Sequence, residues 1–149
     1  MKKVIICDLD NTLFDSRCMD KYFPEDVNSR EGWNEFHKHY SECTRNNFVW
    51  MLLHAAKLNW SKIIFLTGRE DKGNVRKITE EAIRKMNFTN FDLIMRDEND
   101  YRPSHVVKLS KYVEHIKRKY KVDFAIDDDP NCIDMWDKCG INTLQVRIG

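Results

Sequence analysis

Glycine and proline are scarce in this chain, and long hydrophobic runs are absent. The 149 residues include five glycines and three prolines. None of the glycines forms a GxxxxGK[ST] phosphate-binding loop, and no linker rich in Pro, Gly or Ser divides the chain. No apolar run approaches the roughly 20 residues that a membrane-spanning helix needs. These absences exclude a P-loop nucleotide site and a membrane span, and the length predicts a single domain over residues 1–149.

Neither sign of charge dominates, and the cysteines form no motif. Lys and Arg number 25 against 24 Asp and Glu, so the net charge of +1 neither demands nor excludes nucleic acid. The five cysteines contain no CxxC pair and no zinc-like spacing. The N-terminus, MKKVIICDLD, starts basic and then apolar, but two aspartates interrupt the apolar part. We therefore expect reduced thiols, a cytoplasmic location and no membrane attachment.

Five short apolar runs alternate with stretches of helical spacing. The runs predict strands at 4–6, 63–66, 91–95, 122–126 and 141–146. The spacing between them predicts helices at about 48–56, 75–86, 106–116 and 133–136, with Gly140 as a C-cap. This alternation predicts an α/β fold with a doubly wound, mainly parallel, five-stranded Rossmann-like sheet and helices on both faces.

Three of the expected helices have a long apolar stripe that predicts which side faces the sheet. The stripes consist of Phe48, Met51, Leu52, Ala55 and Ala56 in the first helix, of Val75, Ile78, Ala82, Ile83 and Met86 in the second, and of Val106, Leu109, Val113 and Ile116 in the third. Residues three or four apart share one side of a helix, so we expect these side chains to be buried.

Residues 15–47, called the insert from here on, break this alternation. They carry Trp33, Phe36 and Tyr40 among many charges, and they are too numerous for a simple strand-to-helix loop. We predict a small helical, cap-like insert over the end of the first strand. Its aromatic residues either line the entrance to a site or pack the insert onto the domain, whereas His37 and His39 are expected at the surface.

Polar side chains follow three of the predicted strands. Because parallel strands end at one edge of a sheet, a site is expected there. The candidates are Asp8 and Asp10 after the first strand, Thr67, Gly68 and Arg69 after the second, and Asp127 and Asp128 after the fourth. Crowded carboxylates need a cation, and their oxygen atoms favour Mg²⁺, which also binds phosphate oxygens.

These residue types suit phosphoryl transfer through an aspartyl-phosphate. Asp8 is the candidate nucleophile, and Asp10 the candidate acid and base. The Thr67 hydroxyl and the Gly68 backbone are candidate donors to the phosphoryl group. Arg69 either forks onto phosphate oxygens or pairs with Glu70 or Asp71 at the surface. Lys108 is our first choice for a neutralising lysine, with Lys111 as the alternative.

In this order along the chain, the motifs resemble those of the haloacid dehalogenase-like (HAD) phosphohydrolases. The matching segments are DLDNT at 8–12, LTGR at 66–69, Lys108 and Asp127-Asp128. The resemblance implies that Asp8 is the nucleophile and Asp10 the acid/base. It implies that Mg²⁺ is bound by the Asp8 side chain, the Asp10 backbone carbonyl and Asp127, with Asp128 as a further ligand or a supporting group. It also implies a central first strand, flanked by the second and the fourth.

A narrower resemblance concerns the substrate. Segments 101–108, 125–128 and 135–136 look like the 3′-phosphatase domain of phage polynucleotide kinases, which implies a phosphomonoester substrate at DNA or RNA ends and a role in nucleic-acid repair. The short insert leaves the site open to such a large substrate. The basic run 108–121 either follows a nucleic-acid backbone or is a solvated face.

Three alternatives stay open at this point. One is a 5′-nucleotidase acting on free nucleoside monophosphates, in which the aromatic residues of the insert would equally stack on a base. Another is a phospho-accepting receiver domain, although the nucleophile of that class follows the third strand and DLDNT follows the first. The last is a binding domain without activity.

Overall fold

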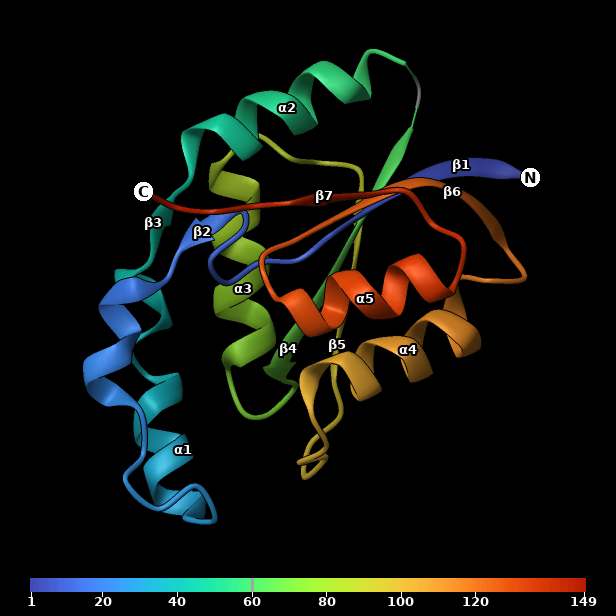
Figure 1. Ribbon diagram of the computed structural model, residues 1–149. Coiled ribbons are helices and arrows are strands. Elements are labelled where there is room, and N and C mark those ends of the chain that lie inside the picture. The colour runs from blue at the N-terminus through green and yellow to red at the C-terminus, as the bar shows by residue number, and fades with distance from the viewer. Residues whose placement is uncertain (60) are drawn as a thin grey trace.

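A five-stranded parallel sheet forms the centre of the protein. The computed structural model describes residues 1–59 and 61–149. The sheet has the order β5-β4-β1-β6-β7, and every neighbouring pair is parallel (Figure 1). Its strands are β1 (Lys2–Cys7), β4 (Lys62–Glu70), β5 (Phe91–Arg96), β6 (Tyr120–Asp127) and β7 (Thr143–Gln145). The predicted α/β class is confirmed, and β1 lies between β4 and β6 as expected.

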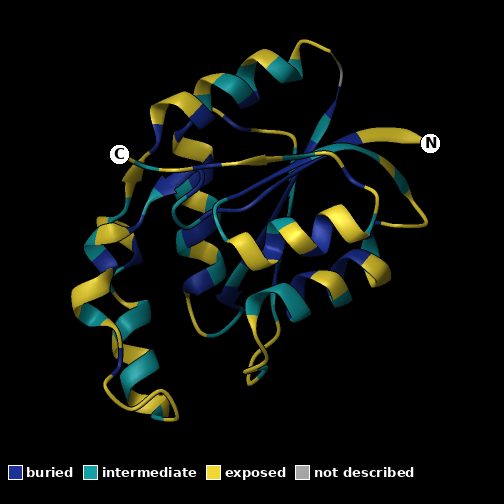
Figure 2. Ribbon diagram, in the orientation of Figure 1, coloured by how far each residue is buried: buried dark blue, intermediate teal, exposed yellow. Residues whose placement is uncertain are grey.

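Two helices cover each face of this sheet. The pair α2 (Asn47–Lys57) and α3 (Val75–Lys85) packs on one face, and the pair α4 (Ser104–His115) and α5 (Pro130–Lys138) on the other (Figure 1). Successive residues of β1 point to opposite faces, so Ile5 joins the first core and Ile6 the second. Figure 2 shows the result, with a buried sheet between helices that are exposed on their outer sides.

The stripe predicted for α2 was wrong in part, since only Leu52 and Ala56 of its members pack against the core. Phe48 and Met51 are exposed, with 53% and 62% of their surface accessible, whereas Val49 and Leu53 are buried against the sheet. This helix is apolar on more than one side, so helical spacing fits two faces equally well and packing decides between them.

The stripe predicted for α4 was also wrong in part, for a different reason, although Ile116 at its end is buried in the core as expected. Leu109 and Val113 are exposed, whereas Val107, Lys108 and Tyr112 are buried. The buried face of α4 includes charged residues, and hydrophobic spacing cannot detect a lysine that is buried because it is paired.

Strand β4 is longer than predicted and includes the polar triplet that was expected to follow it. Its pairing with β5 changes register between Thr67 and Glu70, which marks a bulge. A bulge bends a strand and redirects its side chains. The triplet Thr67-Gly68-Arg69 therefore reaches the carboxyl edge of the sheet from within β4. At the other end of the chain, β7 is shorter than the predicted 141–146.

The insert lies beside the carboxyl ends of β1 and β4 (Figure 1). Short antiparallel strands, β2 (Phe14–Asp15) and β3 (Thr44–Arg45), bring its two ends together. Between them lie the 3₁₀ helices η1 (Arg17–Tyr22) and η2 (Tyr40–Glu42) and the helix α1 (Arg30–His37). Within α1, all of which the structure describes, no residue is buried. A small cluster that includes Met19, Tyr40, Val75 and Met95 joins the insert to α3 and β5.

The membrane prediction can be compared with the helices directly. Among residues 1–59 and 61–149, the structure contains no helix with the length and apolar character needed to cross a bilayer.

Gly140, the predicted C-cap, has a φ of +75° just after the end of α5. Glycine adopts this left-handed conformation without the steric penalty of a side chain.

Candidate active site

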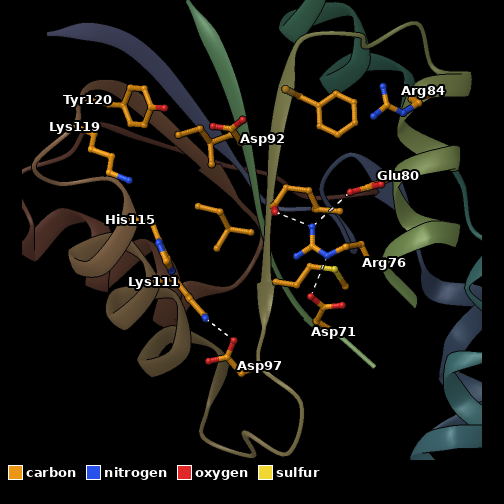
Figure 3. A pocket seen from close by; sticks show the side chains of 15 residues that line it. Asp71, Arg76, Glu80, Arg84, Asp92, Asp97, Lys111, His115, Lys119 and Tyr120 are labelled. Carbon is orange, nitrogen blue, oxygen red and sulfur yellow. Dashed lines mark hydrogen bonds and ion pairs between the residues drawn. The ribbon is translucent and has the colours of Figure 1, made fainter. Parts of the chain in front are cut away.

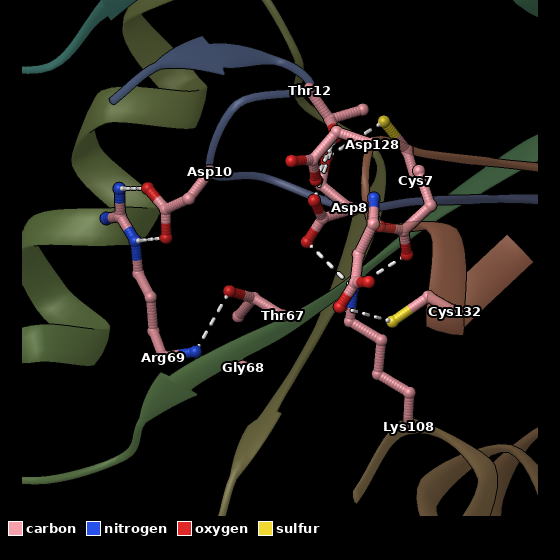
Figure 4. Close-up of polar contacts among 12 residues, drawn as sticks. Cys7, Asp8, Asp10, Thr12, Thr67, Gly68, Arg69, Lys108, Asp128 and Cys132 are labelled. Carbon is pink, nitrogen blue, oxygen red and sulfur yellow. Dashed lines mark hydrogen bonds and ion pairs between the residues drawn. The ribbon is translucent and has the colours of Figure 1, made fainter. Parts of the chain in front are cut away.

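The predicted polar residues, except Arg69, line a crevice of about 360 Å³ at the carboxyl edge of the sheet. They come from the ends of β1 and β6, the bulged part of β4 and the first turns of α4 and α5 (Figure 4). Ser104 and Pro130, which the sequence did not single out, also line it. The complete lining is Asp8, Asp10, Thr67, Gly68, Ser104, Lys108, Asp127, Asp128, Asp129 and Pro130.

Lys108 lies between two of the carboxylates. Its Nζ atom donates to Asp8 Oδ1 at 2.9 Å and to Asp127 Oδ2 at 2.7 Å, and all three side chains are buried. Burial alone lowers the pKa of a lysine, but the charges of Asp8 and Asp127 outweigh it and raise the pKa of Lys108. The ammonium group therefore stays charged and offsets part of the repulsion between the aspartates.

Lys111, the alternative to Lys108, lies elsewhere. Its Nζ atom is 2.7 Å from Asp97 Oδ1, in a groove along the edge strand β5 (Figure 3). His115 and Lys119 line the same groove, together with four acidic side chains. Lys111, His115 and Lys119 of the basic run 108–121 thus lie in a groove of mixed charge, in which Lys111 itself is buried.

Three aspartates are placed where they could bind a divalent cation. Carboxylate oxygens of Asp8, Asp127 and Asp128 all lie within 4.8 Å of one another. Burial and then the charge of Asp8 raise the pKa of Asp127 to about 6 and that of Asp128 to about 8. Such strain among like charges is what a bound cation relieves, and three hard oxygen donors suit Mg²⁺. The residues present therefore fit the implied metal.

Thr12 orients the candidate nucleophile, a role that the sequence did not assign. Its hydroxyl donates to Asp8 Oδ2 at 2.8 Å and also lies 3.3 Å from Asp128 Oδ1. Both oxygens of Asp8 are thus held, one by Thr12 and one by Lys108. The turn after β1 brings Thr12 back, with Asn11 in the left-handed region at φ 58°. The sequence could have indicated this role of Thr12, because Thr12 is the last residue of the DLDNT motif that contains Asp8.

Asp10 points away from this cluster and toward Arg69 (Figure 4). The Arg69 guanidinium forks onto it, with distances of 2.9 Å from Nε to Oδ2 and 2.7 Å from Nη2 to Oδ1, and the Ser16 hydroxyl donates to Oδ1 at 2.6 Å. Burial alone would raise the pKa of Asp10, but the charge and hydrogen bonds of Arg69, with that of Ser16, lower it. Asp10 is therefore held as a carboxylate, outside the acidic cluster.

Both predictions for Arg69 differ from its observed place. Its side chain does not line the crevice, and it pairs with Asp10 and not with Glu70 or Asp71. The guanidinium also donates to the Thr79 hydroxyl at 3.0 Å and lies 3.8 Å from the ring centre of Tyr40. Arg69 thus connects the candidate acid/base to α3 and to the insert.

Thr67 and Gly68 occupy the crevice wall opposite the end of β6. The Thr67 hydroxyl accepts the backbone N–H of Arg69 at 3.1 Å. A Cβ atom at Gly68 would lie only 3.1 Å from Ser104 Oγ, so a side chain there would crowd the start of α4. Asp129, which also lines the crevice, accepts the Asn131 N–H at 2.9 Å and caps α5.

The aromatic residues of the insert differ in what they contact: Tyr40 packs the insert onto the domain, through the cluster with Val75 and Met95, whereas Trp33 packs within the insert. Trp33 packs edge-on against Phe23 and Phe36, and its indole N–H donates to the Val27 carbonyl at 2.8 Å. Trp33 and Tyr40 also line a second cavity, which shares Gly68 with the crevice.

Comparisons with known proteins agree with this geometry. The family model described as the polynucleotide kinase PNKP phosphatase domain matches residues 2–149. Chains in the structures of a Pnkp1/Rnl/Hen1 complex and of the Pnkp1/Rnl/Hen1 RNA repair complex are each 33% identical to this sequence, with TM-scores of 0.79. Both matches cover 100% of this chain, but only 47% and 43% of those chains.

A more distant match shows the fold alone. A candidate beta-phosphoglucomutase from Thermotoga maritima has a TM-score of 0.62 and 16% identity, over 100% of this chain and 87% of that one. The comparison with curated proteins finds no match.

This chain spans less than half the length of the repair-complex chains that it resembles.

Proposed function

From the premise that this chain belongs to the family of PNKP phosphatase domains, and is thus a HAD-type phosphatase, we propose that it removes phosphate from the 3′ ends of nucleic acids. The observation that carries the chemistry is the environment of Asp8. Thr12 and Lys108 fix both of its oxygens, beside Asp127 and Asp128, at the end of the central strand. A receiver domain would instead place its acceptor after the third main-sheet strand, which here is the edge strand β5.

In the first step, an oxygen of Asp8 attacks phosphorus. The new bond joins Asp8 to the phosphoryl group, and the bond between phosphorus and the sugar 3′-oxygen breaks. Mg²⁺, held by Asp8, Asp127 and Asp128, would supply positive charge to the phosphoryl oxygens. Lys108 keeps Asp8 in place and adds a second positive charge close to the reacting group.

Asp10 serves as the acid and base in this proposal. Held by Arg69 as a carboxylate, it is ready to accept a proton from the water that hydrolyses the aspartyl-phosphate. To protonate the departing 3′-oxygen in the first step, it must carry a proton, and protonation weakens the Arg69 fork. The pair with Arg69 therefore sets how readily Asp10 changes between the two roles.

The preference for nucleic-acid ends rests on the family and on its neighbours. The family model is that of a polynucleotide kinase phosphatase domain, and one matched structure is of an RNA repair complex. We propose DNA or RNA ends as the substrates and a role in their repair. The cytoplasm is the proposed location, since all five cysteines are unpaired.

Phosphate release tests the proposal. The panel includes oligonucleotides phosphorylated at the 3′ or the 5′ end, nucleoside monophosphates and an aryl phosphate, each with Mg²⁺ or with EDTA. We expect fastest release from the 3′ end, dependence on Mg²⁺, and a loss of at least about 1,000-fold in Asp8→Asn. Asp134→Asn, on the outer face of α5, is the matched control and should keep activity, because Asp134 is exposed and forms an ion pair with Lys138, away from the crevice.

Three results would contradict parts of this proposal. Faster release from mononucleotides would make the protein a nucleotidase. Activity that survives Asp8→Asn unchanged would show that Asp8 is not the nucleophile. Full activity in EDTA would show that the reaction does not need a divalent metal ion.

A further inference from the structure

A second cavity, of about 290 Å³, adjoins the catalytic crevice. One wall is the insert, the other is the loop between β5 and α4, and residues of β4 and β5 form the floor. We propose that this cavity binds the terminal nucleoside of the substrate, the one whose 3′-oxygen carries the phosphate, and that its base stacks on Tyr101. This inference rests on the proposed function and names the part of the substrate that the protein recognises.

The cavity and the crevice lie on either side of Gly68, which lines both. The Gly68 carbonyl accepts a hydrogen bond from Arg96 Nε at 2.8 Å. Arg96 also donates through Nη1 to the carbonyls of Asp100, at 2.9 Å, and of Arg102. The half-buried Arg96 guanidinium thus ties the loop that carries Tyr101 to the strand that lines the phosphate site, and so holds the two subsites in place relative to each other.

Aromatic rings form much of the remaining lining. On the insert, His37 and Tyr40 are nearly parallel, at 14°, with ring centres 5.6 Å apart, and Trp33 lies next to His37. On the opposite wall, Tyr101 is exposed, and its only hydrogen bond among the described residues goes from its hydroxyl to Asn99. A flat π-system can bind on such a surface whichever base it is, because every base has a stacking face.

The charges of the lining suit a neutral base better than a second phosphate. Arg96 and Arg102 are balanced by Glu70 and Asp100. Burial, then repulsion by Lys72 and Arg69, lower the pKa of His37 to about 4, so its ring is uncharged at neutral pH. The Glu70 carboxylate is buried, and among the described contacts it accepts only the Asn99 N–H, at 3.4 Å. It retains capacity to accept a hydrogen bond from a base or sugar.

The size limits the occupant to one nucleoside. Pockets that enclose small molecules begin at about 300 Å³, and this cavity lies at that lower end. It is too small for a run of nucleotides, which places the rest of the strand in solvent or on the open side of the crevice. Recognition would then depend on the terminal nucleoside, with little demand on length.

A chemical double-mutant cycle tests the contact between the base and Tyr101. The protein change is Tyr101→Ala. The substrate change replaces the last nucleotide of a 3′-phosphorylated oligonucleotide by an abasic sugar phosphate. We expect each change alone to lower kcat/KM, relative to that for an aryl phosphate, by about tenfold, and the two together by little more than either. Tyr101→Phe keeps the ring and should restore the wild-type ratio. Phe48→Ala removes an exposed aromatic ring from α2, outside the cavity, and is the matched control.

The outcomes separate this inference from the proposed function. If wild type releases no phosphate from 3′ ends, the proposed function fails and the inference fails with it. If wild type does release that phosphate, but the two changes together lower kcat/KM by about 100-fold, the base does not contact Tyr101. In that case only the inference is overturned. An equal loss on the aryl phosphate in Tyr101→Ala would show a structural role for the loop, and would also overturn it.

Discussion

The catalytic crevice and the insert lie side by side but are built in opposite ways. The crevice is set in the sheet, and Asp8, Lys108 and Asp127 are all buried within it. The insert has few buried residues, and its helix α1 packs through half-exposed aromatic rings. Precise positioning of reacting groups needs rigid elements, whereas a binding wall tolerates a less stable one. The difference suggests that the sheet performs the chemistry and the insert helps select the substrate.

The largest effect that we predict is a loss of stability when a buried charge of the crevice is removed. Lys108→Met removes the ammonium group that binds both Asp8 and Asp127. Two buried carboxylates then face each other unpaired, so unfolding in urea with EDTA should require about 3–5 kcal/mol less free energy than in wild type. Mg²⁺ should recover part of that loss, because the cation restores positive charge between the same carboxylates.

Lys111→Met, three residues along the same helix, is the matched control. Its partner Asp97 has 73% of its side chain exposed, so the pair is screened and should contribute less than about 1 kcal/mol. Equal urea midpoints for the two variants would show that the carboxylates of the crevice do not depend on Lys108, and would contradict the arrangement proposed here.

The fold and most of the crevice could be predicted because their signals are local. Each strand is a short apolar run, and the polar residues at the ends of β1 and β6 follow in the next few positions. The topology of parallel sheets then brings those ends together without knowledge of any contact. Lys108 could be ranked above Lys111 because it lies earlier in the predicted helix, nearer the end of the sheet where the polar residues gather, and the resemblance supports the same choice.

What the sequence could not supply was the set of contacts between distant residues. Asp10 and Arg69 are 59 positions apart, and their pairing depends on the bulge that turns Arg69 away from the crevice. Ser16 and Tyr40 join that pair from the insert, whose path has no periodic signal. The buried faces of α2 and α4 were predicted only in part, because packing selects one of two apolar sides of α2 and because the buried face of α4 includes the paired Lys108.

A smaller effect is expected where the two regions meet. Arg69→Lys keeps the positive charge but loses the two-pronged contact with Asp10 and the flat stacking on Tyr40. The insert should open more often, and limited proteolysis within residues 15–47 should become several-fold faster. Arg45→Lys, which alters a guanidinium stacked 4.0 Å from the Trp50 ring on the other side of the insert, is the matched control. Equal cleavage of Arg69→Lys and wild type would mean that Asp10 and the insert are not coupled through Arg69.

The smallest effect that we predict is a loss of stability at acidic pH that depends on His37 of the insert. Since the pKa of His37 is about 4 when folded, against an ordinary 6.5, the unfolded chain binds a proton at pH values between these where the folded protein does not. The stability that depends on neutral His37 is therefore complete above about pH 6.5 and is lost as the pH falls toward 4. Because the ring is only half-buried, screening limits the loss to about 1 kcal/mol. His37→Phe keeps an aromatic ring without the titration, so its urea midpoint should fall less than that of wild type between pH 7 and 4.5. If the urea midpoints of wild type and His37→Phe fall equally with pH, His37 is solvated in the folded protein. The insert wall would then be more exposed to water than its packed aromatic rings indicate.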